Sequence, residues 1–117
     1  MTNKLLDVII EGIQDKKGEN IIDIDLTSFE NSICDHFVIC HAQSGTQVNA
    51  IADAIDQKVK ENLQIKKGHK EGFENALWVL LDYHDIVVHV FEEQTRFHYN
   101  LEELWGDAKI EKIESTY

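Results

Sequence analysis

Residues 76–91 constrain the fold of this chain most strongly. They form two runs of β-branched, aliphatic and aromatic residues separated by the polar pair His84-Asp85, a pattern that predicts a β-hairpin. If Tyr83 pairs with Ile86, the alternation of side chains along each strand divides the hairpin into two faces. One face comprises Val79, Leu81, Tyr83, Ile86, Val88 and Val90, and the other comprises Trp78, Leu80, Asp82, Val87, His89 and Phe91.

The second face mixes a large indole, a phenyl ring and aliphatic side chains with a carboxylate and an imidazole. Since the first face already offers six side chains for helices to cover, we expect the second face to stay uncovered by the protein's own helices and to bind a partner. A core position for Trp78 is the alternative, because aromatic residues in strands usually lie inside. For His89, a structural hydrogen bond with Asp82 and direct contact with a partner both stay open.

The first half of the chain predicts a helix, two strands and a second helix. Thr2 or Asn3 can cap a first helix that ends near Gly18, and alternation predicts strands at 20–26, with one wet face, and at 36–42. Ser44 and Gln47 have capping-box spacing for a helix that ends near residue 62. Its predicted inward stripe comprises Val48, Ile51, Ala52, Ile55 and Val59.

The second half predicts little regular structure outside the hairpin. Residues 66–72 form a basic, glycine-punctuated loop, which includes Lys70. Residues 92–99 predict a short helix or turn, and Asn100 has cap spacing for a brief helix that holds Leu101, Leu104 and Trp105. We expect one domain over residues 1–107 and a flexible, fraying tail over 108–117. Together these elements predict an α/β fold, a small mixed β-sheet with helices mainly on one face.

Composition narrows the class of protein. The 117 residues suffice for one domain, and 22 acidic against 11 basic residues give a formal net charge of −11. Phosphates of naked RNA or DNA would repel this charge, whereas a basic protein partner would suit it. No apolar run is long enough to span a membrane, and no export leader is visible, so we expect a cytoplasmic protein.

Two enzymatic or metal interpretations compete with partner binding. Asp23 and Asp25 project from one face of a strand and could hold a divalent metal for nucleotidyl transfer, but no Gly-Ser phosphate cradle precedes them. A zinc site would draw on Cys34 with His36 or on Cys40 with His41, and these spacings do not match the paired ligands of closed zinc sites. Cys34 and Cys40 are too few and too close for a disulfide scaffold, which favours a reducing cytosol. We expect no cofactor and no bound metal.

Several motifs, in order along the chain, resemble the ribosomal silencing factor family, which is also called Iojap-like. They are Lys16-Lys-Gly-Glu-Asn-Ile-Ile-Asp-Ile-Asp25, Asp35-His-Phe-Val-Ile-Cys40 with Ser44, Gln47-Val-Asn-Ala-Ile-Ala-Asp53, Trp78-Val-Leu-Leu-Asp-Tyr83, Asp85-Ile-Val-Val-His-Val-Phe91 and Tyr99-Asn-Leu-Glu-Glu-Leu-Trp-Gly-Asp107. The match covers roughly Leu5 to Asp107. One departure is His84, where the family usually carries glycine, and we expect a wider turn there.

The resemblance implies a nucleotidyltransferase-like fold without catalysis. It implies a protein that binds ribosomal protein L fourteen on the large ribosomal subunit, prevents the small subunit from joining and so represses translation when nutrients are short. We expect the binding face to centre on Trp78, Leu80 and Asp82, with His89 and Phe91 on the same face and with Tyr83 and Lys70 near its rim. When no ribosome is present, the same face could pair two copies of the chain as a homodimer.

Overall fold

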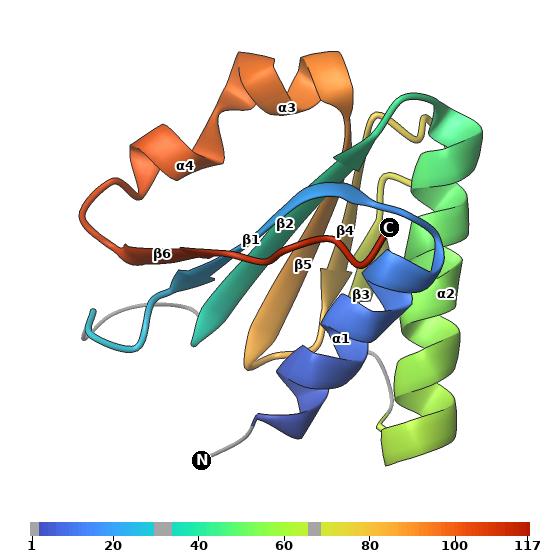
Figure 1. Ribbon diagram of the computed structural model, residues 1–117, viewed down its shortest axis with the longest axis horizontal. Helices are drawn as coiled ribbons and strands as arrows, with labels where there is room; N and C mark the ends of the chain where they lie inside the picture. The colour runs from blue at the N-terminus through green and yellow to red at the C-terminus, as the bar shows by residue number, and fades with distance from the viewer. Residues whose placement is uncertain (1–2, 30–33, 66–68) are drawn as a thin grey trace.

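One mixed sheet organises the chain, and the computed structural model describes residues 3–29, 34–65 and 69–117 of it (Figure 1). The element order is α1 (Lys4–Asp15), β1 (Glu19–Asp25), β2 (His36–Ala42), α2 (Gly45–Leu63), β3 (His69–Glu71), β4 (Trp78–Asp82), β5 (Ile86–Glu92), α3 (Glu93–Tyr99), α4 (Leu101–Leu104) and β6 (Lys109–Lys112). No helix within these ranges is long and apolar enough to cross a membrane.

The sheet has six strands in the order β3-β4-β5-β2-β1-β6. Strands β2 and β5 run parallel, and every other neighbouring pair runs antiparallel. Strands β2 and β5 can run parallel because α2, β3 and β4 connect them. These elements bring the chain back to the end of the sheet at which β2 begins. The α/β fold class with a mixed sheet is confirmed.

The two long helices begin as predicted. The Asn3 side chain accepts a hydrogen bond from the backbone nitrogen of Leu6 at 3.1 Å, and the Ser44 hydroxyl accepts one from Gln47 at 3.2 Å. Both bonds satisfy backbone donors that the first turn of a helix leaves free. The buried residues of α2 are the five of the predicted stripe, Val48, Ile51, Ala52, Ile55 and Val59.

The sheet separates two apolar cores. Helices α1 and α2 lie side by side against one face, where the hairpin residues from Val79 to Val90 on that side join their buried stripes (Figure 1). The other face carries Phe37, Ile39, Val87 and Phe91, and the short helices α3 and α4 arch over part of it. Helices therefore lie mainly, but not wholly, on one face.

The hairpin has the predicted register. Trp78 lies opposite Phe91, Leu80 opposite His89 and Asp82 opposite Val87. The turn stays tight, contrary to the expectation of a wider one. The Tyr83 nitrogen donates to the Ile86 carbonyl at 2.9 Å, and His84 adopts a φ of 71°, in the left-handed region.

Two segments form strands where we expected none. Residues 69–71 of the predicted loop are the edge strand β3, while residues 66–68 of that loop lie outside the described residues. Residues 109–112 of the predicted tail are the edge strand β6, which pairs with β1. Beyond it, the Ile113 nitrogen donates to the Ile21 carbonyl at 2.9 Å, and the Tyr117 hydroxyl donates to the Gly18 carbonyl. In the structure residues 109–113 therefore pair along β1 and cover an edge that would otherwise be open, although all four residues of β6 are exposed.

Candidate functional site

Three side chains of β4 form a partly exposed surface on the sheet face away from α1 and α2. Trp78, Leu80 and Asp82 alternate with the buried residues Val79 and Leu81, so they point together to one side. We call these three residues the β4 surface. Its position next to the edge strand β3 leaves it at the margin of the molecule, where a partner can approach.

Aromatic rings hold the indole of Trp78 on three sides. Its ring centroid lies 4.9 Å from that of Phe91 in a stacked arrangement and 4.8 Å from that of Tyr99, at the end of α3. Its Nε1 atom donates a hydrogen bond to Nδ1 of His89 at 3.0 Å. Trp78 is therefore neither a fully buried core residue nor a free surface side chain.

His89 and Phe91, which we expected on the binding face, lie beneath it. His89 is 4% exposed and Phe91 is 1% exposed. Burial of the imidazole lowers the pKa of His89 to about 4, so the ring is neutral at pH 7. The predicted hydrogen bond between His89 and Asp82 does not form, since Asp82 instead accepts a hydrogen bond from the backbone nitrogen of His84 at 2.8 Å.

Tyr83 and Lys70 lie on the opposite side of the sheet, so their predicted place at the rim of this face is corrected. The Tyr83 hydroxyl donates to Asp56 of α2 at 3.0 Å, and Tyr83 is 3% exposed. Lys70 pairs with Leu81 in the β3–β4 register, and its ammonium group lies 3.1 Å from Asp53 of α2. Both side chains therefore brace the hairpin against α2.

The face that carries Trp78 is only half open, which corrects the expectation that it is uncovered. Trp105, just after α4, packs edge-on against Phe37 with ring centroids 5.8 Å apart, and Leu101 joins the same core. This cover lies over β1 and β2, whereas the β4 side of the face keeps partial exposure. The short C-terminal helices thus restrict any docking to the β4 edge.

Strand β3 adds two polar residues to this edge that sequence reasoning missed. Glu71 pairs with Leu80, and His69 pairs with Asp82, so both side chains project to the face of the β4 surface. Nε2 of His69 lies 2.9 Å from a carboxylate oxygen of Glu71. Residues 69–71 include no apolar residue, so the sequence gives no sign of a strand. Only their pairing with β4 shows that they form one.

The carboxylates of Asp23 and Asp25 are each engaged by a different neighbouring residue. Asp23 is buried, against the expectation of a wet strand face, and its Oδ1 lies 2.8 Å from Nδ1 of His36. Asp25 instead accepts two hydrogen bonds from Thr27, at 2.9 Å and 2.6 Å. Burial raises the pKa of Asp23, and the bonds from Thr27 lower that of Asp25. Each carboxylate thus has its own local role.

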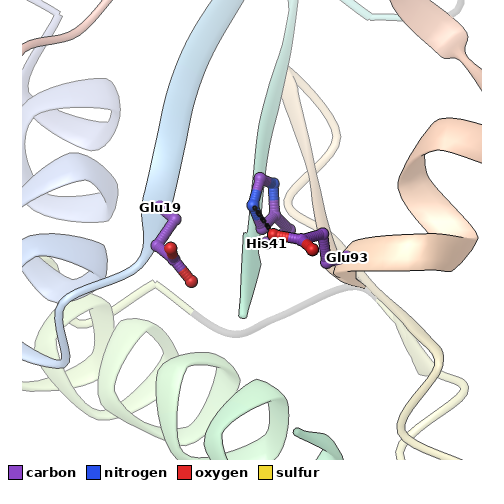
Figure 2. Close-up of side chains that lie close together, drawn as sticks. All are labelled: Glu19, His41 and Glu93. Atoms are coloured by element: carbon purple, nitrogen blue, oxygen red, sulfur yellow. Dashed lines mark ion pairs between the residues drawn. The ribbon is translucent and has the colours of Figure 1, made fainter. Parts of the chain in front are cut away.

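A different cluster is the only group of three potential metal ligands within the described ranges. Glu19 of β1, His41 of β2 and Glu93 of α3 place one ligand atom each within 4.8 Å of the others (Figure 2). Nε2 of His41 lies 3.4 Å from Glu93. The Gln43 amide donates to Glu19 at 3.0 Å and to Glu93 at 2.6 Å, so it already joins the two carboxylates.

The donor set of this cluster fits a structural network better than a metal. Arg96 approaches Nδ1 of His41 at 2.9 Å, and a guanidinium can only donate, so the proton of the neutral imidazole lies on Nε2. That proton faces Glu93 and occupies the nitrogen a metal would need. Burial, and then the charge of Arg96, lower the pKa of His41. The residues do not fit a bound cation.

The cysteines have structural positions. Cys34 donates to the backbone oxygen of His36, with the sulfur 3.4 Å from it, and Cys40 is fully buried in the core. Burial raises the pKa of Cys34 to about 11 and that of Cys40 to about 12. Both thiols are therefore protonated at pH 7 and are poor nucleophiles.

The fold and this surface together define a small α/β protein with a mixed sheet and a half-open apolar face. The family described as ribosomal silencing factor during starvation matches residues 1–116. The chain belongs to the ribosomal silencing factor family.

Relatives in this family match along nearly the whole chain. A ribosomal silencing factor of Bacillus subtilis is 42% identical over 94% of this chain and 92% of its own length. One of Halalkalibacterium halodurans is 42% identical over 99% of this chain and 98% of its own length. A crystal structure of a Chromobacterium violaceum protein matches with a TM-score of 0.83 at 32% identity, over 97% of this chain and 93% of that one. The family assignment therefore applies to the chain as a whole.

Proposed function

We propose that this protein represses translation by docking its β4 surface on ribosomal protein L fourteen of the large ribosomal subunit. The observation that carries the proposal is the half-exposed indole of Trp78, held at the β4 edge while the rest of that face is covered. Central aromatic residues of this kind often dominate the binding free energy of an interface. The bound domain then blocks the small subunit sterically, and no catalytic step or cofactor takes part.

Charge supports a basic partner. Asp82 lies on the β4 surface, Glu71 lies beside Leu80, and the whole chain carries a formal net charge of −11. Such a field attracts a basic protein and speeds encounter, while the apolar contact at Trp78 and Leu80 fixes the site. His89 and Phe91 support the indole from below, and Tyr83 and Lys70 hold the hairpin against α2.

Co-sedimentation with isolated subunits tests the proposal. The wild type is expected to pellet with large subunits and to stay in the supernatant with small subunits. In the cell, we expect the protein in the cytoplasm, where ribosomes work. Trp78→Ala is expected to lose binding while it keeps a wild-type circular dichroism spectrum, with a lower thermal midpoint because Phe91, Tyr99 and His89 lose their contacts with the indole. Phe97→Ala, which truncates a 64% exposed aromatic residue on α3, is the matched control and should bind normally.

Two outcomes of this experiment contradict the proposal. Folded Trp78→Ala that still pellets with large subunits removes the β4 surface from the interface. Equal binding of the wild type to both subunits contradicts a specific target on the large subunit.

Addition of the protein before mixing the two subunits should also lower the yield of joined ribosomes in a sucrose gradient.

A second copy of the chain is a further proposed occupant of the β4 surface. In the absence of ribosomes, pairing of two such surfaces would remove the exposed parts of two indoles from water. Dimerisation and ribosome binding would then exclude each other. Sedimentation velocity of the free protein, repeated with added large subunits, tests this, and a dimer that stays intact on the ribosome contradicts the exclusion.

A further inference from the structure

Trp78 and His89 are diagonal neighbours across the β4–β5 pair, since His89 lies opposite Leu80 and Trp78 lies opposite Phe91. The indole Nε1 donates to Nδ1 of His89 at 3.0 Å. Because Nδ1 acts as the acceptor, the neutral imidazole carries its single proton on Nε2. The bond therefore fixes both the plane of the indole and the tautomer of the histidine.

The other ring nitrogen of His89 has no partner among the described residues. Nε2 is buried and makes no hydrogen bond to any residue that the structure describes. A buried donor without an acceptor destabilises the folded state, and an apolar side chain of similar size would avoid this penalty. Packing alone does not account for a histidine here. Its hydrogen bond with the Trp78 indole is an interaction that an apolar side chain could not make.

We propose that His89 is a positioning residue for the β4 surface, one that holds the Trp78 indole in the orientation that a partner meets. This inference rests on the docking role proposed for Trp78. Phe91 and Tyr99 restrict the indole through ring contacts at 4.9 Å and 4.8 Å, but such contacts tolerate rotation within the plane of the rings. The hydrogen bond to His89 is the directional contact that removes this freedom.

The bond also limits which chemistry can meet the indole. With Nε1 already donating inside the chain, the exposed part of the ring offers carbon atoms but no free donor. Asp82 and Glu71 on the same face favour positive charge. A lysine or arginine side chain, whose aliphatic stem covers the ring and whose charge faces these carboxylates, therefore fits this surface.

Two substitutions separate positioning from packing. His89→Leu nearly keeps the volume, removes the acceptor for Trp78 and removes the unpartnered Nε2 donor. His89→Asn leaves a cavity but places its Oδ1 where the Nδ1 atom lay, so it can still accept from the indole. A packing role predicts that Leu is the milder change, whereas a positioning role predicts that Asn keeps function despite lower stability.

The indole N–H signals of the free protein are the first measurement. The chain has two tryptophans, so the Trp105→Phe variant assigns the Trp78 signal in a proton–nitrogen NMR spectrum. We expect His89→Leu to shift this signal and to speed its exchange with water at least ten-fold, with a urea midpoint at or above that of the wild type. We expect His89→Asn to keep slow exchange with a lower urea midpoint.

Affinity for isolated large subunits is the second measurement. We expect about a ten-fold weaker Kd for His89→Leu and a Kd within about three-fold of the wild type for His89→Asn. Wild-type affinity in His89→Leu, or a His89→Asn variant that binds as weakly as His89→Leu while its indole stays protected, overturns the positioning role. If the wild type does not bind large subunits at all, the proposed function fails, and the exchange data alone still decide whether His89 holds the indole.

Discussion

Arg96 and Glu102 form a two-pronged ion pair, in which Nε and Nη2 of the arginine lie 2.9 Å and 2.7 Å from the same carboxylate oxygen. The third nitrogen of the guanidinium donates to the backbone oxygen of Asn20 at 2.7 Å. Arg96 is 5% exposed. This one side chain therefore joins α3 to the start of α4 and to strand β1. It holds these two short helices in place over the sheet.

Removal of this cation should destabilise the fold strongly. Arg96→Leu leaves the Glu102 carboxylate and the Asn20 carbonyl without their donor, and loss of one partner of a buried pair typically costs about 3 kcal/mol. Urea unfolding measures the change. The control is Lys58→Ala, since Lys58 pairs with the exposed carboxylates of Glu11 and Asp15, and such surface ion pairs contribute little to stability. Equal effects of the two substitutions would contradict this account of Arg96.

Replacement of His84 in the hairpin turn by glycine should stabilise the protein. His84 has a φ of 71°, which disfavours a side chain with a Cβ atom, so His84→Gly should raise the free energy of unfolding by about 0.5 to 1 kcal/mol. Gly72→Ala is the opposite test, because the added Cβ would lie 1.9 Å from the carbonyl oxygen of Trp78. It should destabilise the protein, and a loss of stability in His84→Gly would contradict strain at the turn.

The C-terminal residues should contribute to stability. A chain that ends at Ala108 loses the β6 pairing with β1 and the backbone bond from Ile113 to Ile21, and it exposes the β1 edge. We expect a lower urea midpoint and lower solubility for this truncated form. Ile113→Ser in the full-length chain, which removes a side chain packed against the core, is a milder version of the same test. A frayed tail would leave both midpoints unchanged.

Local patterns explain which parts of the fold were predictable. The hairpin faces and the inward stripe of α2 follow from periods of two and of 3.6 residues, which the sequence displays directly. The caps at Asn3 and Ser44 are equally local. Edge strands β3 and β6 carry mostly polar residues, so their strand form depends on pairing with β4 and β1 rather than on their own composition.

The buried polar network was not predictable for a related reason. His41, Glu93 and Arg96 come together only through the parallel pairing of β2 with β5, which the sequence does not display. The sequence alone also could not show which residues of the hairpin face are exposed. Alternation sorted Trp78 and His89 to one side, but only the position of α3 and α4 determined which of the two is exposed. The hydrogen bond between them likewise required the strand register.

The buried imidazole of His89 should make stability depend on pH. Its folded-state pKa is about 4, below the ordinary value of 6.5, so the unfolded chain takes up the proton first as the pH falls. Stability from a neutral His89 is therefore complete above pH 6.5 and is lost as the pH falls toward 4. Between pH 7 and pH 4.5 we expect the wild type to lose about 2 to 3 kcal/mol relative to His89→Leu.

Urea unfolding of both proteins across this pH range gives the difference directly. The comparison cancels other groups that titrate nearby, such as Asp23, whose raised pKa acts in the opposite direction. A difference between the two proteins that stays constant with pH would contradict a neutral, buried His89.

The claim that the β4 surface is the docking site is tested most directly by the affinity of the purified chain for isolated ribosomal protein L fourteen, measured by titration calorimetry. Loss of a central aromatic residue typically costs at least about 2 kcal/mol, so Trp78→Ala should bind roughly 30-fold more weakly than the wild type, while Phe97→Ala should bind normally. An unchanged affinity in folded Trp78→Ala would contradict the account.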